Sequence, residues 1–157
     1  MKPQIHYRLA EDSDIDQLTE LRIEFLHEVA GGNGGDSSAL RLSLPGYFKT
    51  ALADGSYTCW LAEDSGQIVG LGGMAIWTKP GNLKSPDGKV GYIMNMYTVK
   101  SHRRSGICRE LLKRLEDSAR QQNVSILEMH TTHDGEPAYR QAGYKEPTSK
   151  VLELKLM

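Results

Sequence analysis

Apolar residues recur at every third or fourth position in two long stretches of the chain, and this spacing predicts amphipathic helices. The first helix follows the capping residues at 13–16 and reaches about Val29. The second covers 107–122, where Ile, Leu, Leu and Ala repeat every four residues. The segment 37–53 is also helical in character, but Pro45-Gly46 in its middle predicts two separate pieces, because proline has no backbone N–H.

The pattern changes to alternating apolar and polar residues in the middle of the chain, which predicts β-strands. Asp64-Ser65-Gly66 has the composition of a tight turn and joins two of these strands into an antiparallel hairpin. The Pro- and Gly-containing segment 78–89 predicts a long surface connection. Strands are expected at 5–9, 57–63, 67–77, 90–99 and 124–132, with a last strand after Tyr144 that ends in the alternating residues 151–156 and pairs antiparallel.

A short helix is expected at 136–141, between the last two strands. The order of elements predicts an α/β or α+β fold with a mixed, mostly antiparallel sheet and helices on both faces. No repeat, linker or low-complexity tract divides the series, so the chain is expected to form one domain.

The composition agrees with this picture, because 157 residues with 39% hydrophobic and 25% charged side chains are typical of a soluble domain. The formal net charge of -1 gives no global attraction to nucleic acid or to an anionic membrane, so neither partner is expected. No apolar run is long enough to span a membrane, and no signal-peptide core is present. Cys59 and Cys108 lie in apolar stretches, which suggests reduced thiols and a cytoplasmic location.

The most informative segment is 96–112, where a strand, a short basic loop and a helix follow one another. The first turn of a helix has unpaired N–H groups and a partial positive charge, so it can bind a diphosphate. Ser105 and Gly106 would let the backbone approach such a ligand, and the neighbouring arginines would add charge. The same residues also suit a plain turn with a solvated basic loop. The loop has neither the Gly-Lys-Ser/Thr ending of a Walker loop nor the three glycines of a dinucleotide fold.

The pattern Arg103-x-x-Gly106-x-Cys108 resembles the acyl-CoA loop of the GNAT superfamily of N-acetyltransferases, with Cys108 where the family has Gly or Ala. The segment 138–144 is similar to the Tyr-x-x-x-Gly-Phe/Tyr segment of the same family. The resemblance implies one acyl-CoA N-acyltransferase domain over 1–157 and a GNAT-like sheet whose fourth and fifth strands splay apart. It also implies acetyl-CoA as co-substrate and no metal.

The resemblance further implies roles for individual residues. Backbone amides from 104 to 109 would hold the CoA pyrophosphate, and the backbone of 96–98 would pair with the pantetheine arm beside a bulge. Tyr139 would protonate the departing thiolate, although a tyrosine here can also be purely structural. Thr132 stands where the family often has Asn. The implied cofactor-binding residues are Met96, Tyr97, Thr98, Arg103, Arg104, Ser105, Gly106, Ile107, Cys108 and Arg109.

The acceptor amine must lose a proton before it attacks, and for a lysine-like amine at pH 7 this costs about 4 to 5 kcal/mol. The family has no single fixed base, and the candidates here are Glu28, Glu128 and His130. Glu128 and His130 share one face of a strand by their period-two spacing. Each of the three can equally be structural or solvated. His130, His133 and Asp134 are interpreted as part of a surface loop, since no further metal ligands cluster with them.

The predicted activity is direct transfer of an acetyl group from acetyl-CoA to a primary amine of a small molecule or peptide in a ternary complex. A non-catalytic acyl-CoA-binding regulatory module is the alternative, and a phosphate-ligand binder unrelated to CoA is a third possibility. The acceptor cleft is expected to form from 28–39 and 78–89, whose residues do not identify the acceptor. A second copy of the chain is a further candidate partner, in a homodimer.

Overall fold

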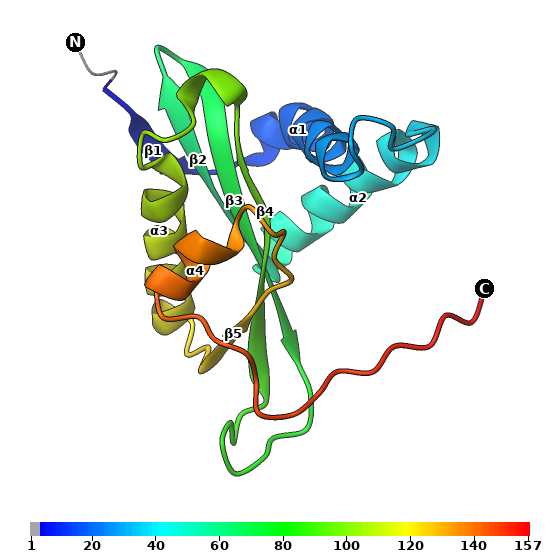
Figure 1. Cartoon of the computed structure of the whole chain (residues 1–157), viewed down its shortest axis with the longest axis vertical. Coiled ribbons are helices and arrows are strands. Elements are labelled where there is room, and N and C mark those ends of the chain that lie inside the picture. The colour runs from blue at the N-terminus through cyan, green and yellow to red at the C-terminus, as the bar shows by residue number, and fades with distance from the viewer. Residues whose placement is uncertain (1–3) are drawn as a thin grey trace.

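The computed structural model describes residues 4–157 as a five-stranded sheet with helices on both faces (Figure 1). Neighbouring strands are antiparallel except β4 and β5, which are parallel, so the predicted mixed sheet is confirmed. The strands, in their order across the sheet, are β1 (His6–Leu9), β2 (Tyr57–Asp64), β3 (Gln67–Thr78), β4 (Lys89–Thr98) and β5 (Ile126–Glu128). The helices are α1 (Ile15–Val29), α2 (Ser38–Asp54), α3 (Ile107–Gln121) and α4 (Glu136–Gln141), with the 3₁₀ turns η1 (Asp12–Asp14) and η2 (Lys100–His102).

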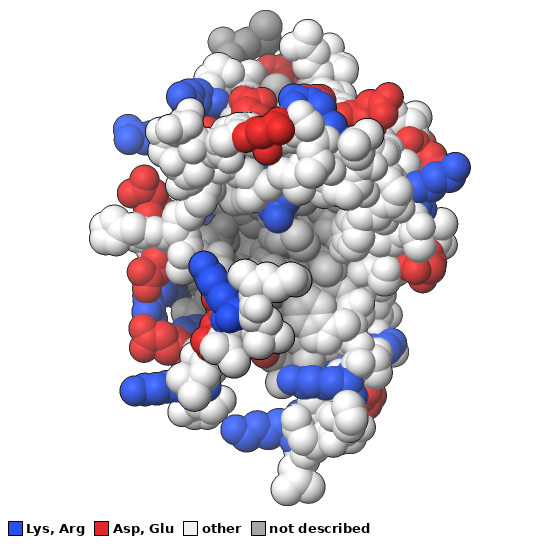
Figure 2. All heavy atoms as spheres, turned by 90° about the vertical axis from the view of Figure 1, so that its right-hand side faces the viewer, with Lys and Arg blue, Asp and Glu red and all other residues white. Residues whose placement is uncertain are grey.

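The helices divide into two layers, α1 and α2 on one side of the sheet and α3 and α4 on the other (Figure 1). Turned so that the side of α1 and α2 faces the viewer, the molecule has a hollow near its centre (Figure 2). No helix within residues 4–157 is both long enough and apolar enough to cross a membrane.

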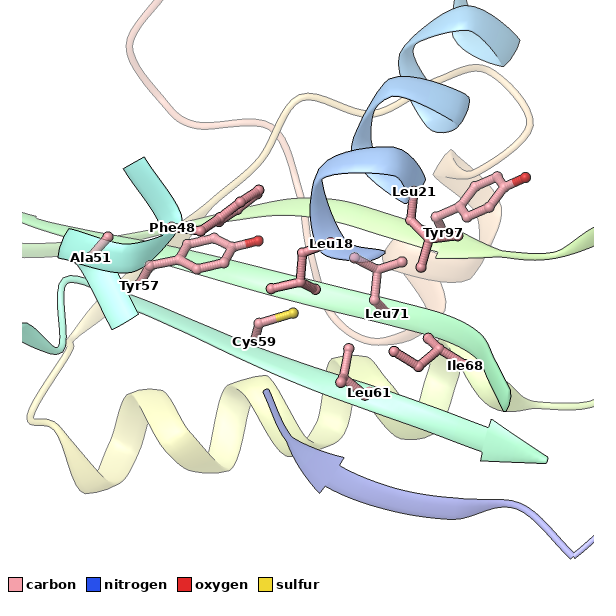
Figure 3. Packing of buried hydrophobic residues seen from close by; sticks show 10 residues of the cluster. All are labelled: Leu18, Leu21, Phe48, Ala51, Tyr57, Cys59, Leu61, Ile68, Leu71 and Tyr97. Atoms are coloured by element: carbon pink, nitrogen blue, oxygen red, sulfur yellow. The ribbon is translucent and has the colours of Figure 1, made fainter. Parts of the chain in front are cut away.

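The hydrophobic core under α1 and α2 follows from the predicted apolar stripes. Leu18 of α1 and Phe48 of α2 are almost fully buried and point toward the side chains of β2, β3 and β4 (Figure 3). Burial of one such side chain stabilises the fold by about 1.5 to 3 kcal/mol. A second core lies under α3, where Leu111 and Leu115 have no exposed surface and Leu115 packs in one cluster with Met74 and residues of β4.

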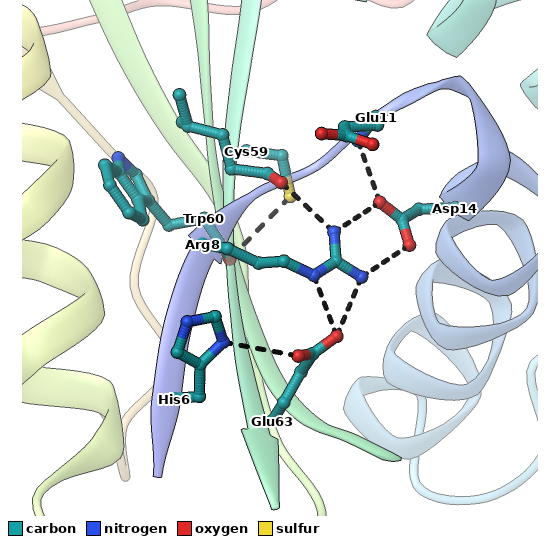
Figure 4. A network of polar contacts seen from close by, with 8 residues as sticks. His6, Arg8, Glu11, Asp14, Cys59, Trp60 and Glu63 are labelled. Atoms are coloured by element: carbon teal, nitrogen blue, oxygen red, sulfur yellow. Dashed lines mark hydrogen bonds and ion pairs between the residues drawn. The ribbon is translucent and has the colours of Figure 1, made fainter. Parts of the chain in front are cut away.

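A partly buried ion-pair network joins the first strand to the start of α1 (Figure 4). Arg8 of β1 donates two hydrogen bonds to the carboxylate of Asp14, at 2.7 and 2.8 Å, and a third to Glu63 of β2 at 2.8 Å. Asp14 also accepts the backbone N–H of Glu11 at 2.8 Å, and its side chain is only 9% exposed. The network therefore fixes the entry of the chain into α1 against the edge of the sheet.

The prediction of two helical pieces between 37 and 53 is wrong, because α2 is one helix that contains Pro45. Proline removes one helical hydrogen bond and costs about 3 kcal/mol. Phe48 and Ala51 are buried on α2, and Leu44 and Leu52 pack beside them. This apolar face spans both sides of the proline, so its packing outweighs the local cost.

Two strand predictions near the C-terminus are also wrong. The predicted strand at 124–132 is reduced to β5, and residues 145–157 contain no strand at all. The residues from 150 onward are extended and exposed and lead away from the body of the molecule (Figure 1). Their alternating apolar side chains pack against no surface formed by the described part of the chain: Val151 is 80% exposed and Leu152 is 91% exposed.

Candidate active site

The sheet opens between β4 and β5. The last residue pair that joins these strands is Tyr92 with Glu128, although β4 continues to Thr98 and stays paired with β3. The edge of β4 from 93 to 98 therefore faces no strand of residues 4–157 on that side, and it can accept an extended ligand through backbone hydrogen bonds. This geometry confirms the predicted splay of the fourth and fifth strands.

A β-bulge interrupts β4 at the opening. The pairing with β3 shifts between Leu71 and Gly73, and Asn95 has a positive φ of 56°. Asn95 is 2% exposed, and its Nδ2 donates to the hydroxyl of Tyr57 at 2.9 Å while its Oδ1 accepts from Arg22. A bulge is expected here from the resemblance, but the roles of Asn95 and Arg22 are not. The signal in the sequence is an asparagine in the middle of an apolar strand.

The loop before α3 has the backbone of an anion site. Gly106 precedes the helix with φ +86°, and a Cβ at this position would meet no atom within 4 Å. The first N–H bond of the helix runs from Glu110 to the Gly106 carbonyl at 3.1 Å. The N–H groups of 107–109 have no acceptor within the described chain. These groups, the open space and the positive end of the helix dipole fit the diphosphate of CoA.

Contacts on both sides hold this loop. His102 of η2 lies 2.9 Å from Asp64 at the end of β2, and the Ser105 hydroxyl donates to the His102 carbonyl. Arg103 donates to the Thr98 carbonyl at 2.8 Å and forms an ion pair with Glu28. The conformation of the loop is therefore fixed by the protein itself.

The arginines of the loop have different surroundings. The guanidinium of Arg103 lies 5.6 Å from the centre of the Tyr97 ring and is bound to Glu28, whereas Arg104 and Arg109 are exposed and take part in none of the ion pairs of residues 4–157. The hydrogen bond from Arg103 lowers the pKa of Glu28. Of the three, Arg104 and Arg109 have side chains available to an anion.

Tyr139 of α4 packs against the cluster that holds Leu112 and Leu115 of α3, and the Cys108 thiol near the start of that helix influences its pKa, so the two sequence motifs meet in space. Burial raises the pKa of Tyr139, and the neighbouring thiol adds to this rise, so the phenol stays protonated and can donate a proton. Burial also raises the pKa of Cys108, which makes its thiol a poor nucleophile. Thr132 accepts the Gly135 N–H at 3.2 Å and so helps to orient α4.

The three base candidates do not lie together. The Nδ1 of His130 lies 2.6 Å from the hydroxyl of Tyr92, and Glu128 is opposite Tyr92 in the β4–β5 register. Both candidates are exposed, and His130 follows the end of β5 rather than lying on it. Glu28 is instead bound to Arg103, so this ion pair must break before its carboxylate can accept a proton.

The two segments expected to form the acceptor cleft lie at opposite ends of the molecule. The connection between α1 and α2 is beside the upper part of the sheet, and the loop 79–88 is at its lower end (Figure 1). The loop 79–88 is also internally bonded, with the Asn82 side chain accepting the N–H groups of Lys84 and Ser85. The prediction that both segments form one cleft is therefore wrong.

Comparison with known proteins agrees with this site. The model of the acetyltransferase (GNAT) family matches residues 18–144. A predicted acetyltransferase from Clostridium acetobutylicum, crystallised with acetyl-CoA, is 29% identical over 98% of this chain and 97% of that chain, with a TM-score of 0.89. A GCN5-related N-acetyltransferase from Ralstonia eutropha JMP134 is 26% identical over 96% and 99%, with a TM-score of 0.81. No relative among the curated proteins matches the chain.

A more distant structure shares the fold alone. Glucosamine-6-phosphate N-acetyltransferase from Arabidopsis thaliana is 15% identical over 96% of this chain and 98% of that chain, with a TM-score of 0.73. The architecture is therefore kept at low sequence identity.

Proposed function

Because the chain belongs to the GNAT family of acetyltransferases, we propose that it transfers the acetyl group of acetyl-CoA to a primary amine in a ternary complex. The observation that carries the proposal is the packing of Tyr139 against α3, the helix that follows the predicted acyl-CoA loop. Tyr139 also packs in one cluster with Met96 of β4 and Met129, which follows β5. A proton donor, an anion site and the opening between two strands thus converge on one place.

Acetyl-CoA fits this place in two ways. The free N–H groups of 107–109 suit its diphosphate, and the unpaired edge of β4 over Met96, Tyr97 and Thr98 suits the amide-containing pantetheine arm. Arg104 and Arg109 add positive charge from the surface. Cys108 is larger than the Gly or Ala of the family, but its backbone N–H is equally able to donate.

The chemistry follows from the groups around the opening. The amine attacks the thioester carbonyl, a C–N bond forms, and a backbone N–H of β4 stabilises the oxyanion. The C–S bond then breaks, and the Tyr139 hydroxyl donates its proton to the leaving thiolate. The proton of the amine passes to His130 or Glu128, directly or through water. Their common neighbour Tyr92 lies on the strand that carries the oxyanion donor.

A panel of primary amines with acetyl-CoA, followed by release of free thiol, tests the proposal. We expect thiol release that depends on one class of amine, and calorimetric binding of acetyl-CoA without any amine. Binding of acetyl-CoA without thiol release from any amine would instead favour a regulatory module. Equal binding of ADP and CoA would favour a phosphate-ligand site, because ADP lacks pantetheine.

We also propose that the chain forms a homodimer through its C-terminal segment 150–157. The segment is extended and alternates apolar with charged residues, as an edge strand does. β5 is the last strand of the sheet and leaves one edge open. A groove of about 420 Å³ lies beside β5, and Val124, Leu127 and Tyr144 are among its lining residues. The segment of a second copy fits this edge and groove, because strand addition would bury its leucines.

A further inference from the structure

Arg22 differs from the other arginines of the described chain. Six of these arginines pair with a carboxylate, and Arg104 and Arg109 are exposed. Arg22 is half-buried, and none of the ion pairs within residues 4–157 includes it. A partly buried charge without a counter-ion is costly, so its place in the fold needs a reason.

The surroundings of Arg22 fix its position but do not neutralise its charge. Its Nη1 donates to the Oδ1 of Asn95 at 2.5 Å, and the amide of Asn95 is held in turn by the Tyr57 hydroxyl. The guanidinium carbon lies 5.9 Å from the centre of the Phe25 ring. Burial lowers the pKa of Arg22. The other groups that influence this pKa are tyrosine hydroxyls rather than carboxylates.

One edge of the guanidinium is unused. No hydrogen bond within the described chain involves Nε or Nη2 of Arg22, and neither atom is completely enclosed by protein. These two nitrogens present parallel N–H groups, which is the arrangement that binds both oxygens of a carboxylate. The single positive charge of Arg22 is also neutralised by the single negative charge of a carboxylate, whereas a phosphate dianion would leave one negative charge over.

The location of this edge connects it to the proposed reaction. Arg22 is bonded to Asn95, the bulge residue at the opening between β4 and β5. The face formed by α1 and α2 is hollowed near its centre (Figure 2). Tyr92, which influences the pKa of Arg22, is also the residue bonded to His130. A ligand on Arg22 therefore lies near the bulge of β4.

We infer that Arg22 binds a carboxylate of the acceptor, so that the acceptor is an amine of the amino-acid class. This inference rests on the proposed function, because it names the acceptor of that reaction. An amino acid has its amine two bonds from the carboxylate carbon. A carboxylate on Arg22 would thus keep the amine close to β4, the strand whose backbone N–H is proposed to stabilise the oxyanion.

Matched acceptors and matched variants test the inference. Each amino acid is compared with its carboxamide and its decarboxylated amine, and phosphoethanolamine provides a phosphate. For the wild type, we expect the amino acids to be the best acceptors. Arg22→Gln is expected to lower their kcat/KM by about 10- to 100-fold, the usual effect of losing a charge-assisted hydrogen-bonded pair. Arg22→Lys should lower kcat/KM for the amino acids by a smaller factor. Arg41→Gln, which removes an exposed ion pair between α2 and α1, should leave kcat/KM unchanged.

Two results would overturn the inference while the proposed function stands: equal use of amino acids and carboxamides, or an equal loss with every acceptor in Arg22→Gln. Preference for phosphoethanolamine would replace the carboxylate by a phosphate. Failure of the proposed function looks different, with no binding of acetyl-CoA and no thiol release. In that case, calorimetry of the same amino acids with wild type and Arg22→Gln decides the inference: binding lost in the variant supports it, and no binding to either protein rejects it.

Discussion

The Oε1 atom of Glu28 lies 2.7 Å from Nη2 of Arg103, and this ion pair joins the end of α1 to the loop before α3. Arg103 also donates to the Thr98 carbonyl at 2.8 Å, so one side chain connects the first helix, the open end of β4 and the loop. The pair therefore contributes to the shape of the proposed cofactor site, and it holds the Glu28 carboxylate in its ionised form.

The pH dependence of acetyl transfer should separate the three base candidates. The pKa of Glu28 is lowered by Arg103, so its carboxylate is already ionised well below neutral pH and cannot produce a rise in rate near neutrality. We expect Glu28→Gln to keep the rising limb of kcat/KM against pH, and His130→Gln to shift or remove it. Glu128→Gln completes the series. A limb lost only in Glu28→Gln would identify Glu28 as the base, and a limb common to all variants would point to the acceptor or to water.

Substitution of Gly106 should abolish cofactor binding. A glutamate at this position would fill the open space before α3 and repel the diphosphate, so we expect acetyl-CoA to bind about 100-fold more weakly or not at all. Gly55→Glu is the matched control, because Gly55 also has a left-handed φ and open space where a Cβ would lie, but caps α2 instead. Calorimetry on both folded variants makes the comparison. Unchanged affinity in Gly106→Glu would remove the loop from the site.

Loss of the Tyr139 hydroxyl should separate binding from chemistry. We expect Tyr139→Phe to bind acetyl-CoA normally and to transfer the acetyl group about 10² to 10⁴ times more slowly, because the leaving thiolate loses its proton donor. Tyr144→Phe is the control. The ring of Tyr144 packs edge to face against that of Tyr139, with 6.2 Å between the ring centres, and the buried Tyr144 hydroxyl has no hydrogen-bond partner within the described chain. Normal turnover by Tyr139→Phe would show that this tyrosine is structural.

The Arg8–Asp14 pair should make the protein sensitive to acid. The hydrogen bonds from Arg8 lower the pKa of Asp14 in the folded state, so the stabilisation is present above the ordinary aspartate pKa and is lost as pH falls through the lowered value. Asp14→Asn is expected to reduce the free energy of unfolding by about 2 kcal/mol at pH 7 and by little near pH 2. Denaturant unfolding at both pH values measures this. Asp117→Asn, which breaks an exposed pair with Arg120, should cost less than about 1 kcal/mol at either pH.

The C-terminal segment should control the oligomeric state. Leu154→Glu places a charge among the apolar side chains of the proposed added strand, and we expect it to convert a dimer into a monomer. Lys155→Glu changes the charge at the next position, which has the opposite side-chain direction, and should leave the dimer intact. Light scattering over a range of protein concentrations distinguishes the two. A wild-type monomer at every concentration would reject the proposed dimer.

Local patterns predicted most of the fold. The alternation over β2 and β3, with Ser65 and Gly66 between them, is sufficient for a hairpin, and the apolar stripe of α3 is sufficient for a helix. Pro45 was misleading because tertiary packing on both sides of it keeps α2 whole. The segment after Tyr144 has the alternation of a strand but no neighbour in its own chain, and a pattern cannot supply that neighbour.

The candidate site was predictable only where it is continuous in sequence. The loop before α3 and the segment with Tyr139 each carry a short motif. Arg22 and Asn95 are 73 positions apart and meet only because α1 packs across β4. Their contact depends on the fold as a whole, so the polar residue Asn95 in an apolar strand is a signal in the sequence, but its pairing with Arg22 is not.

The bulge at Asn95 also determines which core each residue of β4 joins. Before it, Ile93 packs under α3 and Met94 under α1, whereas after it Met96 lies under α3 and Tyr97 under α1. The extra residue thus interrupts the regular alternation of side chains between the two faces of the strand. Deletion of Asn95 alone would remove the bulge and leave Ile93, Met94, Met96 and Tyr97 on their present faces in plain alternation, but it would also remove the hydrogen bonds that Asn95 forms with Tyr57 and Arg22. A shortening by one residue at the bulge would therefore preserve the interior, whereas the same shortening in the regularly paired part of β4 would move the residues on one side of it to the opposite face.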